Sequence, residues 1–151
     1  MKNFFNPKEF NEAVEIGNCL KFALMQKGEP DDGKCWSFTI PCDPDTGRPF
    51  GGYETPVKSF VSFAAKKGLQ VRLVSSIEET EGKVSFFLWG WFRNRTILGF
   101  ANDDFHIVRR NADGTYVHKA DNSKRTVAEV TTLEDVRKEY DETPYIFVLE
   151  E

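Results

Sequence analysis

Histidine and cysteine, which carry much of the proton and thiol chemistry of proteins, are scarce in this sequence: its 151 residues include two histidines and three cysteines. Any imidazole chemistry must therefore use His106 or His118. An odd number of cysteines argues against a disulfide framework and leaves at least one thiol free. Cys35 and Cys42 are too widely spaced for a zinc knuckle, and the two histidines do not form a helical pair. We therefore expect neither a metal nor another cofactor.

Long apolar runs and large clusters of one charge are also missing. No stretch approaches the roughly 18 consecutive apolar residues of a membrane span, and residues 1–7 contain no continuous apolar segment of the kind that a signal peptide needs. The formal net charge is −4, and basic residues occur in short runs such as Lys66-Lys67 and Arg109-Arg110. We therefore expect no membrane and no nucleic acid as partners. The protein is expected to be cytoplasmic, or exported without a cleaved signal peptide.

Hydrophobic patterning predicts a single domain over residues 1–151 of the α+β class, with N-terminal helices packed on a mostly antiparallel sheet. Asn6-Pro7 is typical of a helix start, and Val57, Phe60, Val61 and Ala64 form an apolar stripe at helical spacing. The segment 28–55 is rich in proline and glycine, so we expect it to be irregular. The predicted helices span residues 7–15, 19–26, 55–67 and 132–140, and the predicted strands span residues 69–74, 83–92, 104–110, 116–121 and 145–149.

Two alternating segments, one on each side of residues 111–115, predict a hairpin that carries both histidines. The turn sequence Asn-Ala-Asp-Gly-Thr favours a three-residue loop with Gly114 in the left-handed conformation. Paired residue numbers then sum to 226, which places His106 opposite Ala120 and His118 opposite Val108. Because this sum is even, the two histidines share one face as diagonal neighbours.

Cys19 is the first candidate for a nucleophile. It begins a predicted helix directly after a candidate N-cap, Asn18, and the free N–H groups at a helix start stabilise a thiolate. The alternative is that Cys19 is a small core residue on an apolar helix face. Cys35 is a rival nucleophile, because residues 33–38 are similar to the sequence around the catalytic cysteine of papain-like enzymes. Such a cysteine also begins a helix, however, and Pro41 follows too soon to leave room for one.

Two imidazoles on one face suit a proton relay. His106 would take the proton of the Cys19 thiol, and His118 would bond the far ring nitrogen of His106 and fix its tautomer. The alternative is that one histidine is a half-buried sheet residue and the other is exposed to solvent. Asp121 is a poorer orienting residue, because the same register places it on the opposite face of the hairpin.

The same segments resemble a known family. Residues 17–24, Gly-Asn-Cys-Leu-Lys-Phe-Ala-Leu, look like the start of the nucleophile helix in NlpC/P60-like cysteine peptidases and amidases, a papain-like group. Residues 104–106 and 114–119 are similar to the histidine-bearing strands of that group. The resemblance implies a papain-like fold with Cys19 as nucleophile, His106 as general base and the second histidine as the orienting residue.

The resemblance also implies a function: a thiol-dependent amide hydrolase that acts through an acyl-thioester on a peptide substrate, such as a peptidoglycan stem peptide. Two alternatives stay open, a protein-modifying effector (a deamidase or isopeptidase) and a non-catalytic binding module on the same fold. The expected partners are a peptide or peptidoglycan-type substrate, a protein target, or an immunity or inhibitor protein. The separation of 106 − 19 = 87 residues between Cys19 and His106 exceeds that of compact family members. The oxyanion partner does not carry over, and Tyr53 is one guess for it.

Overall fold

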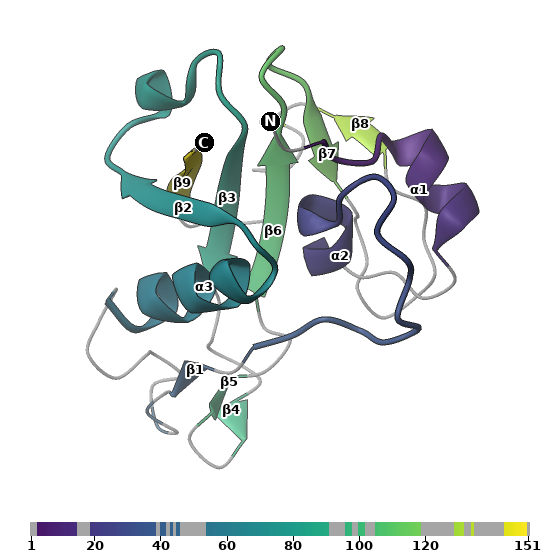
Figure 1. The fold of residues 1–151 in the computed structure, drawn as a ribbon. Helices are drawn as coiled ribbons and strands as arrows, with labels where there is room; N and C mark the ends of the chain where they lie inside the picture. Colours follow the sequence, from purple (N-terminus) through teal and green to yellow (C-terminus); the bar gives the residue numbers. More distant parts are fainter. Residues whose placement is uncertain are drawn as a thin grey trace.

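A six-stranded antiparallel sheet forms the centre of the chain, and helices pack on one of its faces in the computed structural model (Figure 1). The strands follow the order β2-β9-β3-β6-β7-β8, so that β9, the last strand, inserts between β2 and β3. The structure describes residues 3–14, 19–38, 40–41, 43, 45, 54–90, 96–97, 100–101, 105–118, 129–131, 134 and 144–150.

Helix α1 (Pro7–Ala13) begins where the sequence predicts. The side chain of Asn6 accepts a hydrogen bond from the backbone N–H of Glu9 at 2.9 Å, and the Glu9 carboxylate accepts one from the backbone N–H of Asn6 at 3.3 Å. This reciprocal capping box satisfies backbone donors that have no partner inside the helix. The proline at the first helical position adds a preset φ angle. The predicted helix start is therefore confirmed.

Helices α2 (Cys19–Leu24) and α3 (Glu54–Lys66) lie on the same face of the main sheet (Figure 1). Phe60 of α3 packs against Phe86 and Phe147 of the sheet, with ring centroids 6.1 and 4.7 Å apart. All six residues of α2 are buried, and its apolar side chains belong to the same core cluster. The two helices therefore share one hydrophobic core with the sheet, which is the largest source of stability in such a layered fold.

The register of the main sheet is continuous across its central strands. Phe86 of β3 lies opposite Arg109 on one side and opposite Phe147 on the other. Paired residues share a face and consecutive residues alternate between faces, so this register assigns each side chain to one side of the sheet. The strands are β2 (Gln70–Val74), β3 (Ser85–Gly90), β6 (Phe105–Arg110), β7 (Tyr116–His118), β8 (Glu129–Thr131) and β9 (Tyr145–Glu150).

Four short elements complete the described fold. A second sheet of three strands has β5 (Phe100–Ala101) between β1 (Ile40–Pro41) and β4 (Thr96–Ile97). A 3-10 helix, η1 (Ile77–Thr80), follows β2. None of these elements is predicted from the sequence, because two to four residues are too few to show a hydrophobic period.

Side chains of β6 are divided between two buried clusters, one on each face of the sheet. Ile107 belongs to the larger cluster, which also contains the core residues of α2 and α3. Val108 belongs to a smaller cluster on the other face, together with Trp89. His106 lies opposite Trp89 in the register, so its side chain points to the same face as the smaller cluster.

Arg109 anchors α2 to the sheet. Its buried guanidinium donates hydrogen bonds to the carbonyls of Phe22 and Ala23, both at 3.1 Å, and to the carbonyl of Phe5 at 2.8 Å. Because the last carbonyls of a helix have no partner inside it, the guanidinium acts as a C-terminal cap for α2. Burial lowers the pKa of Arg109 to about 10, and the group therefore stays cationic at neutral pH.

The α+β class, with helices packed on an antiparallel sheet, is confirmed. The predicted strand over residues 116–121 is described only as Tyr116–His118, and the predicted helix over residues 132–140 lies almost entirely outside the described residues. A papain-like arrangement of these elements stays a prediction. Within the described part of the chain, no helix has the length and apolar character to cross a membrane.

Candidate functional site

The predicted nucleophile and its predicted base lie on opposite faces of the main sheet. Cys19 is 2% exposed and belongs to the cluster that includes Ile107. His106 is also 2% exposed, precedes Ile107 in β6 and faces the other cluster with Trp89. Because adjacent residues of a strand point to opposite faces, the sheet separates the Cys19 sulfur from the His106 ring. The predicted contact between them is therefore wrong, and Cys19 is the core residue of the alternative interpretation.

The hairpin register that carries the histidines is confirmed. Arg109 pairs with Val117 and Arg110 pairs with Tyr116, and both pairs sum to 226. Gly114 has a φ angle of 91°, as the predicted loop requires. The turn chemistry thus fixed the pairing of β6 and β7, but pairing within a hairpin says nothing about which helix covers each face.

The structure places the remaining predicted site residues apart from any thiol–imidazole pair. His118 ends β7, and its side chain lies outside the described part of the structure. Cys35 is exposed in the segment 27–38, which contains no helix, so the helix start that papain-like chemistry needs is missing there. Cys42, Tyr53 and Asp121 lie outside the described residues. Among the residues described, no group of three or more histidine, cysteine, aspartate or glutamate side chains could hold a metal ion.

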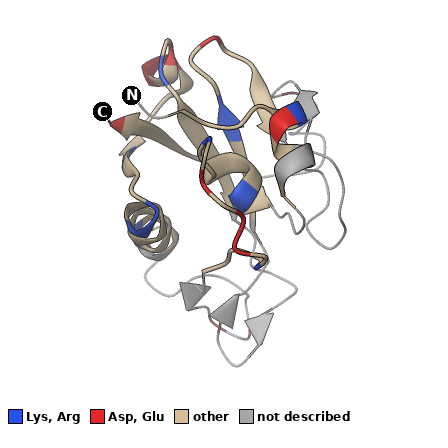
Figure 2. Cartoon of the chain, turned by 45° about the vertical axis from the view of Figure 1, so that its right-hand side comes forward, with Lys and Arg blue, Asp and Glu red and all other residues tan. Residues whose placement is uncertain are grey.

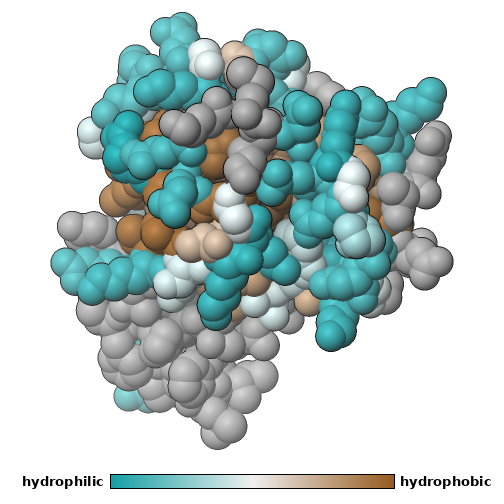
Figure 3. Space-filling model, viewed as in Figure 1, coloured by the Kyte–Doolittle hydropathy of each residue, from teal (hydrophilic) through white to brown (hydrophobic). Residues whose placement is uncertain are grey.

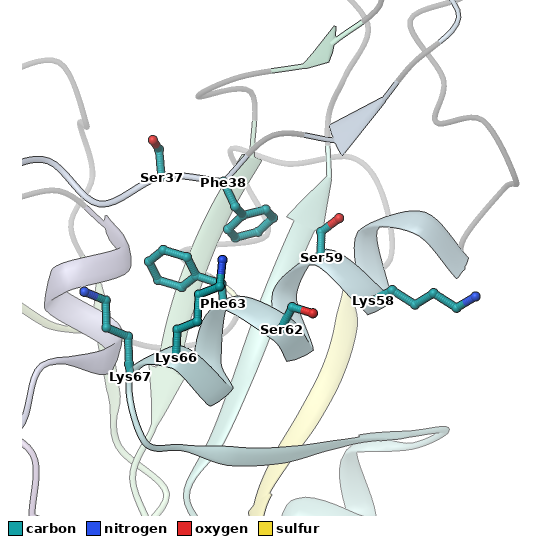
Figure 4. A pocket seen from close by; sticks show the side chains of 8 residues that line it. All are labelled: Ser37, Phe38, Lys58, Ser59, Ser62, Phe63, Lys66 and Lys67. Atoms are coloured by element: carbon teal, nitrogen blue, oxygen red, sulfur yellow. The ribbon is translucent and has the colours of Figure 1, made fainter.

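A groove with one basic side lies between α3 and the segment that leads to Phe38 (Figure 4). Its volume is about 570 Å³; α3 contributes Lys58 and Lys66 to it, and Lys67 follows directly after the helix. None of the eight described residues that line it is acidic. The groove therefore offers positive charge and hydroxyl donors together, which suits an anionic ligand. The lining residues are Ser37, Phe38, Lys58, Ser59, Ser62, Phe63, Lys66 and Lys67.

Helical spacing spreads the lysines along the groove. Lys58, Ser62 and Lys66 recur every four residues, so they form a row on one side of α3. In Figure 4, Lys58 stands at one end of the groove and is directed outward, whereas Lys66 and Lys67 stand at the other end. Eight residues at 1.5 Å per residue separate Lys58 from Lys66 by about 12 Å along the helix axis. The charges therefore do not converge on a single point.

Aromatic rings form the floor of the groove. The centroids of Phe38 and Phe63 are 5.6 Å apart, with an angle of 43° between the ring planes. Phe38 also packs on Phe60 at 6.2 Å, and Phe63 packs on Trp36 at 6.2 Å. Because these rings pack on one another, they form a fixed apolar floor rather than a set of free ring faces.

Lys67 connects the groove to a series of polar contacts that are partly buried. Its Nζ atom lies 3.8 Å from the centroid of the Trp36 ring, and the Trp36 indole N–H donates a hydrogen bond to Asp32 at 3.1 Å. Asp32 in turn pairs with Lys21 at 2.8 Å, and Asp31 pairs with the same Lys21 ammonium at 2.5 Å. Figure 2 shows this acidic stretch beside the lysine of α2. These contacts hold one wall of the groove in place against α2 and α3.

Lys21 and Asp32 are both ionised at neutral pH. The side chain of Lys21 has no exposed surface, and its burial alone lowers the pKa of the ammonium. The hydrogen bonds and charges of Asp31 and Asp32 outweigh that effect, so the net pKa of Lys21 is raised. The hydrogen bond from Lys21 also holds the pKa of Asp32 well below its usual range, with further hydrogen bonds from the Lys34 backbone and Trp36.

The sequence patterns do not predict this groove, because Lys66-Lys67 is a basic run too short for nucleic-acid binding and the predicted helix over residues 55–67 is defined by its apolar stripe. The available signal was the periodicity of the polar face, because the lysines and serines at positions 58, 59, 62 and 66 lie on the side of the helix away from Phe60 and Ala64. The opposite wall, near Phe38, carries no such periodicity.

Few large hydrophobic side chains are exposed to solvent on the described surface. Among the described residues, Leu73 of β2 is the exposed large hydrophobic side chain, and 36% of its surface is accessible to solvent. Figure 3 shows the hydrophobic colours gathered around β2 and mostly hydrophilic colours elsewhere on the described part of this face.

Comparisons with known proteins give the chain no family. No protein-family model matches its sequence, no curated protein matches it, and no solved structure matches its fold. The resemblance to NlpC/P60-like hydrolases therefore stays a prediction, and the function is inferred from the chemistry of the described residues.

Proposed function

We propose that this chain is a binding module whose ligand site is the basic groove over α3, which is one of the alternatives that the sequence left open. The observation that carries the proposal is the composition of the groove: three lysines and three serines surround two phenylalanine rings, and none of the described lining residues is acidic. A ligand with negative charge and an apolar part would complement that surface.

The positions of Cys19 and His106 favour a binding module over the thiol-dependent hydrolase. Proton transfer from a thiol needs an imidazole within hydrogen-bond reach, directly or through one water. Side chains on opposite faces of a sheet cannot meet that requirement. The hydrolase stays a prediction from the sequence, and thiol labelling tests it independently of the groove.

The overall charge of the chain would restrict what the groove accepts. A net charge of −4 repels a long polyanion at a distance. Within the screening length of about 8 Å at physiological salt, however, the groove lysines dominate the local field. A short anionic group that reaches the groove is therefore attracted, and its affinity should fall as salt is added.

Isothermal titration calorimetry with a hexaglutamate peptide, at low and at physiological salt, tests this proposal. The groove variant carries Lys58→Glu and Lys66→Glu. The matched control carries Lys8→Glu and Lys83→Glu, which change two exposed lysines outside the groove and give the same net charge. We expect the groove variant to bind about tenfold or more weakly than the control, because two favourable charge contacts become repulsive. Equal affinities in both variants would exclude the groove as the site.

A further inference from the structure

We infer that the ligand of the groove is an extended acidic segment of a protein, with carboxylates at positions i and i+4 and an apolar side chain at i+2. The inference rests on the proposed function and adds the class and spacing of the ligand. It follows from the placement of Lys58 and Lys66 at opposite ends of a floor formed by Phe38 and Phe63.

The positions of the two lysines along α3, rather than the directions of their side chains in Figure 4, set the ligand spacing that we infer. Lys58 and Lys66 are about 12 Å apart along the axis of α3. An extended peptide advances about 3.3 Å per residue, so four residues span about 13 Å. Carboxylates at i and i+4 therefore match the two ends of the groove, whereas adjacent carboxylates can reach only one end.

Side chains of an extended peptide point alternately to its two sides, and this alternation determines which kind of residue suits the middle of the ligand. Residues i, i+2 and i+4 point to the same side of an extended peptide. If the two acidic residues face the lysines, residue i+2 faces the floor between them, where Phe38 and Phe63 lie. An aliphatic side chain there would lose contact with water, which adds a favourable apolar contribution. Ser62 lies in the row of the two lysines and Ser59 lies next to that row, and both offer hydroxyl donors to the peptide carbonyls.

The floor and the charge of the chain argue against a single-stranded nucleic acid as ligand. Proteins that bind such strands offer free aromatic faces on which bases stack. Phe38 and Phe63 pack against each other and against Phe60 and Trp36, so their rings are already part of the core. The net charge of −4 also repels a polyanion. A peptide with two spaced carboxylates fits both observations.

The wall of the groove is held in place without a ligand. Lys21 pairs with Asp31 and Asp32, and Asp32 accepts a hydrogen bond from Trp36, one residue before the lining residue Ser37. A fixed wall reduces the ordering that binding would otherwise require. The ligand therefore meets a site whose length is set by α3 and whose width is set by this wall.

Two peptides of the same composition test the spacing. The spaced peptide is acetyl-Ser-Glu-Ser-Leu-Ser-Glu-Ser-amide, and the clustered peptide is acetyl-Ser-Ser-Glu-Glu-Leu-Ser-Ser-amide. Each is titrated into the full chain, into the Lys58→Glu, Lys66→Glu variant and into the Lys8→Glu, Lys83→Glu control. We expect the spaced peptide to bind the full chain and the control about fivefold more tightly than the clustered peptide, and the groove variant to lose this preference.

The remaining outcomes separate this inference from the proposed function. Equal affinities for the two peptides, with hexaglutamate binding still lost in the groove variant, would overturn the inference and leave the proposed function standing. Absence of binding by hexaglutamate and by both peptides would overturn both. Tighter binding of an oligothymidylate of eight nucleotides than of either peptide, also lost in the groove variant, would replace the acidic segment by a nucleic acid.

Discussion

The ammonium of Lys67 lies over the ring of Trp36, with 3.8 Å between the Nζ atom and the ring centroid, while Lys67 also lines the groove. A cation in this position is attracted by the negative face of the ring. Trp36 is itself buried and bonded to Asp32, so the contact joins the end of α3 to the opposite wall. The groove is thus closed at this end by an interaction between its two sides.

Replacing Lys67 by methionine should weaken the protein modestly. The variant Lys67→Met keeps much of the apolar stem but loses the cation–π contact, which is worth about 0.5–1 kcal/mol at a partly exposed site. Urea unfolding monitored by circular dichroism measures the change in the free energy of unfolding. Lys58→Met is the matched control, because Lys58 is exposed and directed outward in Figure 4. Equal losses in both variants would contradict a specific contact with Trp36.

Replacing Arg109 should be far more damaging. Arg109→Met leaves the carbonyls of Phe5, Phe22 and Ala23 without their buried donor. Hydrogen bonds from a charged group contribute about 1.5–3 kcal/mol, so we expect a loss of about 3 kcal/mol in the free energy of unfolding. Arg72→Met removes only an exposed pair with Glu150 and should cost less than about 1 kcal/mol. A similar small loss for both variants in urea unfolding would show that Arg109 does not anchor α2.

Local features of this fold could be predicted from the sequence. The helix start at Asn6-Pro7 and the turn around Gly114 depend on a few adjacent residues, and the structure contains both. The predicted stripe of α3 likewise places Phe60 and Ala64 in the core. In each case a short segment has one low-energy geometry, so its residues alone are informative.

Relationships between distant segments could not be predicted in the same way. The hairpin register placed both histidines on one face, but whether α2 packs on that face or on the other depends on the whole core. Arg109 also appeared as part of a short basic run, whereas it is buried because three carbonyls need its donors. The groove combines one face of α3 with an irregular wall, and only the face has a periodic signal.

The pairing of Asp32 with Lys21 should make stability depend on pH in acid. The folded pKa of Asp32 lies below its unfolded value, so its contribution is complete above the unfolded pKa of about 3.9 and is lost as the pH falls toward the folded pKa. We therefore expect the full chain to be more stable than Asp32→Asn by a constant amount near neutral pH. That difference should shrink below about pH 4.

The matched background for this measurement is Lys21→Met, in which Asp32 has lost its main partner. In that background, Asp32→Asn should change the urea midpoint much less, and with a weaker dependence on pH. The pKa of Lys21 is raised, so its contribution is present below the unfolded value of about 10.4 and declines only above it. A stability difference that stays unchanged down to pH 3 would contradict the assignment to Asp32.

Thiol labelling should distinguish Cys35 from Cys19. Cys35 is exposed and Cys19 is 2% exposed, so iodoacetamide should modify Cys35 in the folded protein and reach Cys19 only on unfolding. A Cys42→Ser variant retains only these two thiols, and peptide mass spectrometry measures how far each of them is modified. Rapid labelling of Cys19 near neutral pH that is lost in His106→Ala would instead restore the thiol–imidazole relay of the predicted hydrolase.

Amide chemical shifts of the ¹⁵N-labelled chain during titration with the spaced acidic peptide test the central claim most directly. We expect the largest changes at Ser37, at Phe38 and from Lys58 of α3 to Lys67, with saturation as peptide is added. The same titration of the Lys58→Glu, Lys66→Glu variant should leave these signals nearly unchanged. Shift changes that saturate at residues remote from α3, or that persist in the variant, would contradict the groove as the binding site.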